Sequence, residues 1–173
     1  MADTTNEADE RLMQWLRDAH AMEKQAETML SGMESRIEHY PHLRKRIAQH
    51  LKETQHQAQR LDDAIGRLGG STSAIKDTVA SLTTMMQTLM TGMAGDEVMK
   101  GLLAGYTFEH YEIGAYRILL AAAGTLGDVE TARILRENLR EEEDMAQWLS
   151  SNIDPLTAEY LEREQAGSVH AKR

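Results

Sequence analysis

Four glutamates occupy positions where the buried face of a helix would ordinarily carry a hydrophobic residue. Glu109 shows this most clearly, because Leu102, Tyr106, Ile113 and Leu120 recur around it at helical spacing and Glu109 falls on the same line. An unpaired carboxylate is costly to move out of water, so each buried glutamate needs a strong partner. A metal ion in a helical core is such a partner. The four are Glu23, Glu53, Glu109 and Glu142.

Histidines accompany Glu53 on the second helical segment. The motif Glu53-x-x-His56 has the spacing by which one helix delivers a carboxylate and an imidazole to a single ion. His50-x-x-Glu53 is a competing version of the same pattern. On a helical wheel His50 and Gln57 project closest to the apolar centre, Glu53 is intermediate and His56 is furthest out. The choice between the two histidines therefore stays open.

The composition limits what these residues can do. The 173-residue chain contains no cysteine, so any metal must be held by oxygen and imidazole nitrogen. The net charge of −9 argues against binding to nucleic acid, which requires a basic face. No apolar run approaches the roughly 20 residues that span a bilayer, and the acidic start is unlike a secretory signal. We expect a cytoplasmic protein without a membrane partner.

The elements that must position the glutamates are all expected to be helices. Only two prolines and abundant Ala, Leu, Glu, Gln, Arg and Met favour helix throughout. We predict a disordered tail over 1–9, a four-helix bundle over 10–153, and a short helix with a polar tail over 154–173. The four main helices are expected at about 10–40, 42–68, 97–124 and 128–152. A short crossover helix is expected within 71–96, and a short C-terminal helix at 156–165 after Pro155.

The glutamates divide into two hairpins of similar construction. Glu23 and Glu53 are 30 residues apart, and Glu109 and Glu142 are 33 apart, so each antiparallel pair places its carboxylates at a similar depth. Four helices that each give a glutamate to one level of the core form the arrangement that binds two metal ions in carboxylate-bridged bundles. The sequence therefore predicts a dinuclear metal site.

Four motifs in order resemble the ferritin-like superfamily and, within it, the bacterial YciE/YciF group. They are Ala21-Met-Glu-Lys-Gln25, His50-Leu-Lys-Glu-Thr54, Glu109-His-Tyr-Glu-Ile113 and Leu135-x-Glu-x-Leu-x-Glu-Glu-Glu143. The resemblance implies an antiparallel four-helix core, a stress-associated bacterial setting, a di-iron or di-manganese centre and a small oligomer, a homodimer rather than a ferritin cage. It does not imply a known reaction, because ferritin-like folds serve many functions.

The fourth helix departs from the usual pattern of such sites. A di-iron bundle ordinarily has Glu-x-x-His on two helices, yet neither Glu142 nor Glu143 has a histidine three residues later. Glu112, one turn from Glu109, is a substitute ligand. It would give an oxygen-richer site that shifts preference from iron toward manganese. Alternatively, the second metal position is weak or lost.

Two functional hypotheses follow. In the first, two iron or manganese ions, or zinc under crystallisation conditions, react with dioxygen or hydrogen peroxide in peroxidase or ferroxidase chemistry during oxidative or metal stress. The ligands would be the four buried glutamates, with Glu112 and Glu143 as supplementary ligands and His56 or His50 as nitrogen donor. In the second, the bundle is a non-catalytic structural or partner-binding protein with weak or no metal binding. Its methionine-rich segment would then serve as a contact surface.

Overall fold

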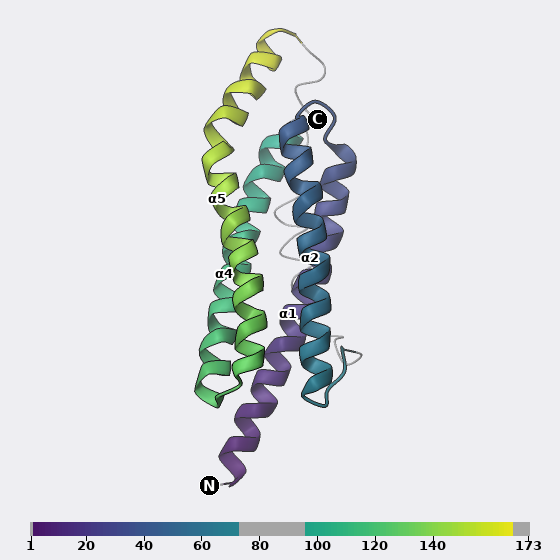
Figure 1. Ribbon diagram of the computed structural model, residues 1–173. Coiled ribbons are helices and arrows are strands. Elements are labelled where there is room, and N and C mark those ends of the chain that lie inside the picture. The colour runs from purple at the N-terminus through teal and green to yellow at the C-terminus, as the bar shows by residue number, and fades with distance from the viewer. Residues whose placement is uncertain (1, 73–95, 168–173) are drawn as a thin grey trace.

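Four long helices form an antiparallel bundle in the computed structural model, which describes residues 2–72 and 96–167 (Figure 1). They are α1 (Ala2–Arg36), α2 (Pro41–Arg67), α4 (Glu97–Leu126) and α5 (Val129–Gln165). The described part of the chain is therefore all-α, as the sequence predicted. The expected crossover helix between the hairpins lies outside the described residues. None of the described helices is both long enough and apolar enough to span a membrane.

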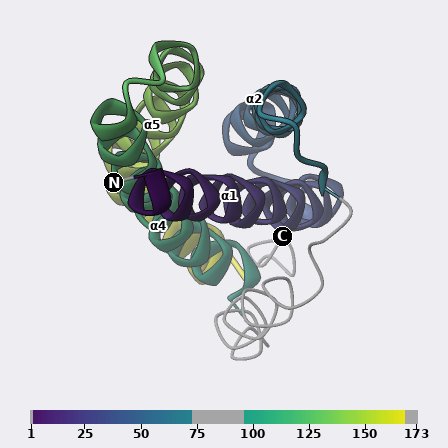
Figure 2. The same cartoon turned by 90° about the horizontal axis from the view of Figure 1, so that it is seen from below.

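The bundle is built from two helical hairpins. Helix α1 packs along α2, and α4 packs along α5, while lesser contacts join α1 to α4 and α2 to α5. Seen end-on, the helices surround a common centre in the order α1, α2, α5, α4 (Figure 2). Every helix thus presents one face to the same interior, which is the condition for four separate glutamates to meet.

Local signals in the sequence set the ends of these helices. Pro41 stands in the first turn of α2, where its missing N–H has no intrahelical partner to lose. Gly127 ends α4 with φ 73°, a left-handed conformation that suits glycine. The Asp128 carboxylate then caps α5 by accepting a hydrogen bond from the backbone N–H of Thr131 at 3.1 Å.

Two helices are longer than the sequence predicted. Helix α1 already begins at Ala2, so it includes most of the expected tail. Helix α5 continues through Pro155 to Gln165 instead of stopping near Asn152. A proline inside a helix costs about 3 kcal/mol, but the segment beyond it buries Leu156 and Tyr160 in the core. Burying each such side chain contributes about 1.5–3 kcal/mol, which offsets that cost.

The core is apolar at both ends and polar in its middle. Large side chains such as Leu16, Leu30, Phe108 and Leu135 are fully buried. Nine polar or charged side chains among the described residues are buried with them, and they are Glu23, His50, Thr54, Gln57, Glu109, Glu112, Thr131, Asn138 and Glu142. Thr131 lies apart at the start of α5, where its hydroxyl accepts a hydrogen bond from Arg67. Buried charge on this scale is rare without a compensating partner, so the other eight side chains form the candidate functional site.

Candidate metal centre

Three helices bring one imidazole and three carboxylates together in the core. His50 from α2, Glu109 and Glu112 from α4, and Glu142 from α5 each offer one ligand atom, and these atoms all lie within 4.8 Å of one another. All four side chains are at most 1% exposed. This separation allows a single cation to contact every member of the group.

Helical periodicity explains how each helix supplies its part. On α2, His50, Thr54 and Gln57 follow one another at intervals of four and three residues, so they share the buried face. On α4, Glu109 and Glu112 are one turn apart and both face inward.

His50 stands at the centre of the contacts. Its Nε2 atom lies 3.2 Å from Oε2 of Glu109 and 3.4 Å from Oε2 of Glu142. Its Nδ1 atom lies 3.0 Å from Oε2 of Glu53. The Nδ1 atom faces an ionised carboxylate, which can only accept, so Nδ1 carries a proton. Nε2 is the nitrogen that faces the cluster, and it would bind a metal by giving up its own proton.

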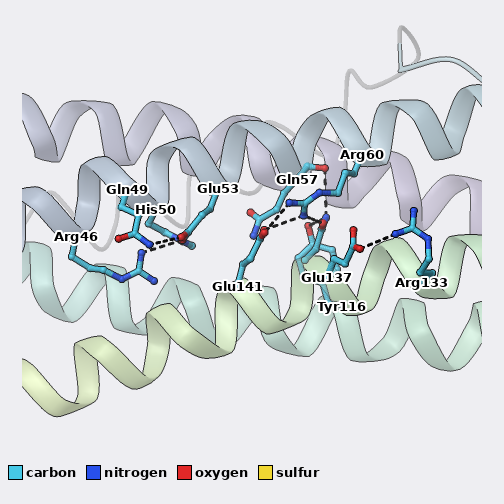
Figure 3. A network of polar contacts seen from close by, with 11 residues as sticks. Arg46, Gln49, His50, Glu53, Gln57, Arg60, Tyr116, Arg133, Glu137 and Glu141 are labelled. Carbon is cyan, nitrogen blue, oxygen red and sulfur yellow. Dashed lines mark hydrogen bonds and ion pairs between the residues drawn. The ribbon is translucent and has the colours of Figure 1, made fainter.

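Glu53 holds the His50 ring from outside the cluster. Figure 3 shows Arg46, Gln49 and His50 converging on its carboxylate, with Arg46 at 3.0 Å and Gln49 at 2.8 Å. Burial would raise the pKa of Glu53, but hydrogen bonds from His50, Gln49 and Arg46 outweigh it and lower the pKa to about 2. Glu53 is therefore ionised at neutral pH and orients the imidazole.

Glu23 faces the cluster from α1 and is fully buried. Its Oε1 atom accepts a short hydrogen bond from the Tyr116 hydroxyl, and its Oε2 atom has no hydrogen-bond partner. Burial first, and then the nearby charge of Glu142, raise its pKa well above the usual value. Glu23 is thus electrostatically linked to the group of four without being one of the four.

Many polar atoms in this part of the core make no hydrogen bond of normal geometry. Eight such atoms belong to six side chains, namely Glu23, Thr54, Gln57, Glu109, Glu112 and Glu142. Both oxygens of Glu142 and both polar atoms of the Gln57 amide are among them. Burial would raise the pKa of Glu142, but His50 first, and then Glu109 and Gln57, outweigh burial and lower that pKa. Buried polar groups are nearly always satisfied in folded proteins. A group of unsatisfied oxygens therefore fits a site that a cation completes.

Without a cation, two of the three carboxylates in the cluster, those of Glu109 and Glu112, keep their protons to a higher pH than usual. Burial raises the pKa of Glu109 to about 8, even though His50 opposes the shift. Burial and the charges of Glu142 and Glu23 raise the pKa of Glu112 well above its usual value. Burial would lower the pKa of His50, but the carboxylates around it raise that pKa well above its usual value. A divalent ion would replace these protons.

The remaining predicted ligands lie away from the cluster. His56 is exposed. The Glu143 side chain is 45% exposed and pairs with Arg117 at 2.7 Å. The structure therefore brings His50 and not His56 to the group, and Glu142 and not Glu143.

Two participants were not predicted from the sequence. Asn138 and Arg60 form hydrogen bonds that connect the surface to Tyr116. Asn138 could have been predicted from its spacing, because it lies one turn before Glu142 on the buried face of α5. No sequence signal identified Arg60, because its partner lies on a different helix.

Known proteins share this architecture. A crystal structure of a protein from Xanthomonas campestris is 43% identical over 92% of this chain and 99% of its own, with a TM-score of 0.79. YcfI from Rhodopseudomonas palustris is 28% identical over 83% of this chain and 92% of its own, with a TM-score of 0.73. An archaeal Dps homologue from Halobacterium salinarum has a TM-score of 0.70 over 85% of this chain and 81% of its own. At 20% identity it supports the fold alone.

A family model agrees with these structures over nearly the whole chain. It matches residues 7–162 and is described as a domain of unknown function, DUF892. The match includes α2 and α4 entirely, most of α1 and α5, and every member of the buried cluster. The chain belongs to the DUF892 family, the YciE/YciF-like proteins with a ferritin-like four-helix fold.

Proposed function

We propose that the buried cluster binds two divalent iron or manganese ions and that the protein uses them on a small oxidant, dioxygen or hydrogen peroxide, in oxidative or metal stress. The observation that carries the proposal is the group of His50, Glu109, Glu112 and Glu142, whose ligand atoms lie within 4.8 Å of one another in a fully buried core. The stress setting rests on the family resemblance.

The charge of the site supports two ions. Glu23, Glu109, Glu112 and Glu142 carry four negative charges when all are ionised, and two divalent cations would neutralise them. Carboxylate oxygens with one imidazole suit manganese and iron better than soft metals. The Oε2 atom of Glu23 and the Oε1 atom of Glu142, which have no hydrogen-bond partner, would be available to a second ion.

The chain's own residues prepare the site for redox chemistry. Glu53 holds His50 with Nε2 directed at the cluster, and the surrounding helices keep the carboxylates out of bulk water. Bound iron or manganese would supply one-electron chemistry toward a small oxidant. Only small molecules fit this proposal, because the ligand residues are closed off from the surface.

Metal loading tests the proposal directly. Protein purified without chelator is incubated with iron(II) or manganese(II), freed of unbound ions, and analysed for metal content. We expect about two ions per chain. Glu109→Gln should reduce the content, whereas Glu143→Gln, a matched change at an exposed glutamate, should not. Wild-type protein that retains less than about one ion per chain would overturn the proposal.

A paired change of histidines tests which one binds. His50→Gln should lower metal content, and His56→Gln, on the same helix but exposed, should leave it unchanged. The opposite result would place the site on the outer side of α2.

A non-catalytic structural role is the alternative. His50 already contacts two carboxylates of the cluster, and protons on Glu109 and Glu112 reduce the remaining repulsion, so the core can exist without metal. YcfI carries a provisional description as a structural protein. A ligand that binds only the native state must raise the melting temperature. An unchanged melting temperature with iron, manganese and zinc would favour this role.

A further inference from the structure

A chain of hydrogen bonds runs from the protein surface to Glu23 and uses one residue from each helix. Its members are Arg60 on α2, Asn138 on α5, Tyr116 on α4 and Glu23 on α1. We propose that Tyr116 is a positioning residue, which holds one oxygen of Glu23 so that this ligand offers only its other oxygen to a metal. The inference rests on the proposed function, because it concerns a ligand of that site.

The chain consists of three consecutive hydrogen bonds. A guanidinium N–H of Arg60 donates a short hydrogen bond to Oδ1 of Asn138. Nδ2 of Asn138 donates to the Tyr116 hydroxyl oxygen at 2.9 Å. The Tyr116 hydroxyl donates a short hydrogen bond to Oε1 of Glu23. Asn138, Tyr116 and Glu23 are fully buried, so water does not compete for these bonds.

The direction of the chain is fixed by its first member. A guanidinium has donors and no acceptor, so the Asn138 amide must turn its oxygen toward Arg60 and its nitrogen toward Tyr116. The same nitrogen also lies 3.5 Å from the backbone oxygen of Gln57, a second acceptor on that side. The Tyr116 oxygen therefore accepts, and its proton is left to donate to Glu23.

Arg60 is itself held in place near the surface. Two hydrogen bonds of 2.7 and 3.0 Å join its guanidinium to the Glu141 carboxylate, as Figure 3 shows. A guanidinium stays charged at any physiological pH. The orientation of the buried amide and phenol is thus set by a permanent charge at the edge of the bundle.

This chain of hydrogen bonds leaves Glu23 with one carboxylate oxygen that has no partner. Its Oε1 atom is occupied by Tyr116, and its buried Oε2 atom has no partner. In Glu142, by contrast, Oε1 has no hydrogen-bond partner and Oε2 lies 3.4 Å from Nε2 of His50. Glu23 would therefore act as a one-oxygen ligand with a fixed orientation, whereas neither oxygen of Glu142 is held by a comparably short hydrogen bond. The two metal positions would differ, and the one nearer Glu23 would depend on Tyr116.

Binding of manganese(II) to Tyr116→Phe tests this inference. Titration calorimetry and electron paramagnetic resonance of bound manganese measure affinity and metal environment without any activity assay. Outer partners of metal ligands typically contribute about 10–100-fold to affinity, and we expect a loss of that order in the Glu23-dependent binding step. Tyr111→Phe, an exposed tyrosine on the same helix, is the matched control and should bind like wild type.

A double-variant comparison separates positioning from general damage to the fold. In a Glu23→Gln background, Tyr116→Phe should cause little further loss, because the two changes remove the same contribution. Arg60→Met keeps the phenol but removes the charge that orients the amide, and it should weaken the same step less strongly. The melting temperature of each metal-free variant records whether the bundle remains folded. If Tyr116→Phe does not fold, the Arg60→Met result decides.

The outcomes distinguish the two proposals. Wild-type protein that binds no metal would overturn the proposed function. Wild-type protein that binds manganese, with Tyr116→Phe binding equally well, would overturn only the positioning role. The positioning role would also fail if Glu23→Gln had no effect on binding, or if Tyr116→Phe weakened binding equally with and without Glu23.

Discussion

Removal of metal should make the stability of this protein decline as pH rises through neutrality. Glu109 is fully buried, and its pKa in the folded chain is raised from 4.5 to about 8, mainly by burial. Between those two values the folded state holds a proton that the unfolded state has released. A group with a raised pKa stabilises the fold at low pH, and that contribution is lost as pH rises toward the folded pKa.

The other titratable groups of the site either add to this loss of stability with rising pH or titrate outside the interval between pH 4.5 and about 8. The pKa values of Glu23, Glu112 and His50 are also raised, so their contributions have the same sign. The pKa of Glu53 is lowered to about 2, so its contribution is lost only as pH falls below the usual glutamate range. The metal-free protein should therefore be most stable in mildly acidic solution.

The size of this change in the free energy of unfolding follows from the one proton that Glu109 holds. Each such proton changes the free energy of unfolding by about 1.4 kcal/mol per pH unit. From about pH 6 to about pH 7.5, Glu109 alone should lower the free energy of unfolding by about 2 kcal/mol. For a chain of this length that corresponds to a fall in melting temperature of about 4–8 °C.

Urea unfolding followed by circular dichroism, with chelator present, measures this dependence. Glu109→Gln should make the fall in stability with pH less steep, because an amide does not titrate in this range, while Glu23, Glu112 and His50 still contribute. Saturating manganese(II) should flatten or reverse it, since metal binding displaces the protons and strengthens as pH rises. Metal-free wild-type protein that is equally or more stable at the higher pH would refute the reasoning about buried, protonated carboxylates.

Three further changes have defined outcomes. Glu53→Gln should weaken manganese(II) binding by about 10–100-fold in calorimetry, because the His50 ring loses its charged partner; an unchanged affinity would argue against that role. Phe108→Ala should lower the free energy of unfolding by about 3–5 kcal/mol, because the ring is fully buried, and a loss below 1 kcal/mol would contradict this packing. Asp128→Ala should cost about 1 kcal/mol through loss of the α5 cap, measured against Asp144→Ala, an exposed site on the same helix.

The helical hairpins were predictable because their signals are local. Pro41, Gly127 and Asp128 act within one turn of themselves, and the structure confirms the helix boundaries they indicate. The helix end predicted from Pro155 was wrong because contacts with distant residues, and not the local signal, decide where α5 ends. The local preference of Pro155 ends a helix, but Leu156 and Tyr160 pack into the core beyond it, and Arg163 reaches the backbone oxygen of His39 at 3.0 Å.

The site was predictable in outline from burial patterns. Glu23, Glu109 and Glu142 interrupt apolar lines, and the structure buries all three. The helical wheel also placed His50 nearer the centre than His56, and the structure has His50 buried and His56 exposed. Whether these residues bind metal stays a prediction.

Side-chain contacts between different helices could not be predicted from the sequence. Glu53 lies on the flank of α2, where its partners Arg46 and Gln49 hold it beside His50. The path from Arg60 through Asn138 to Tyr116 joins α2, α5 and α4. Such contacts depend on how far each helix is rotated and shifted against its neighbours, which the periodicity of one helix does not specify.

A crystal structure of the protein soaked with manganese(II), with anomalous data collected on both sides of the manganese absorption edge, tests the central claim most directly. The claim predicts an anomalous peak in the core, within about 2.0–2.2 Å of Nε2 of His50 and of carboxylate oxygens from Glu109 and Glu142. Absence of any peak there, with the His50 Nε2 atom still against those two carboxylates, would contradict it.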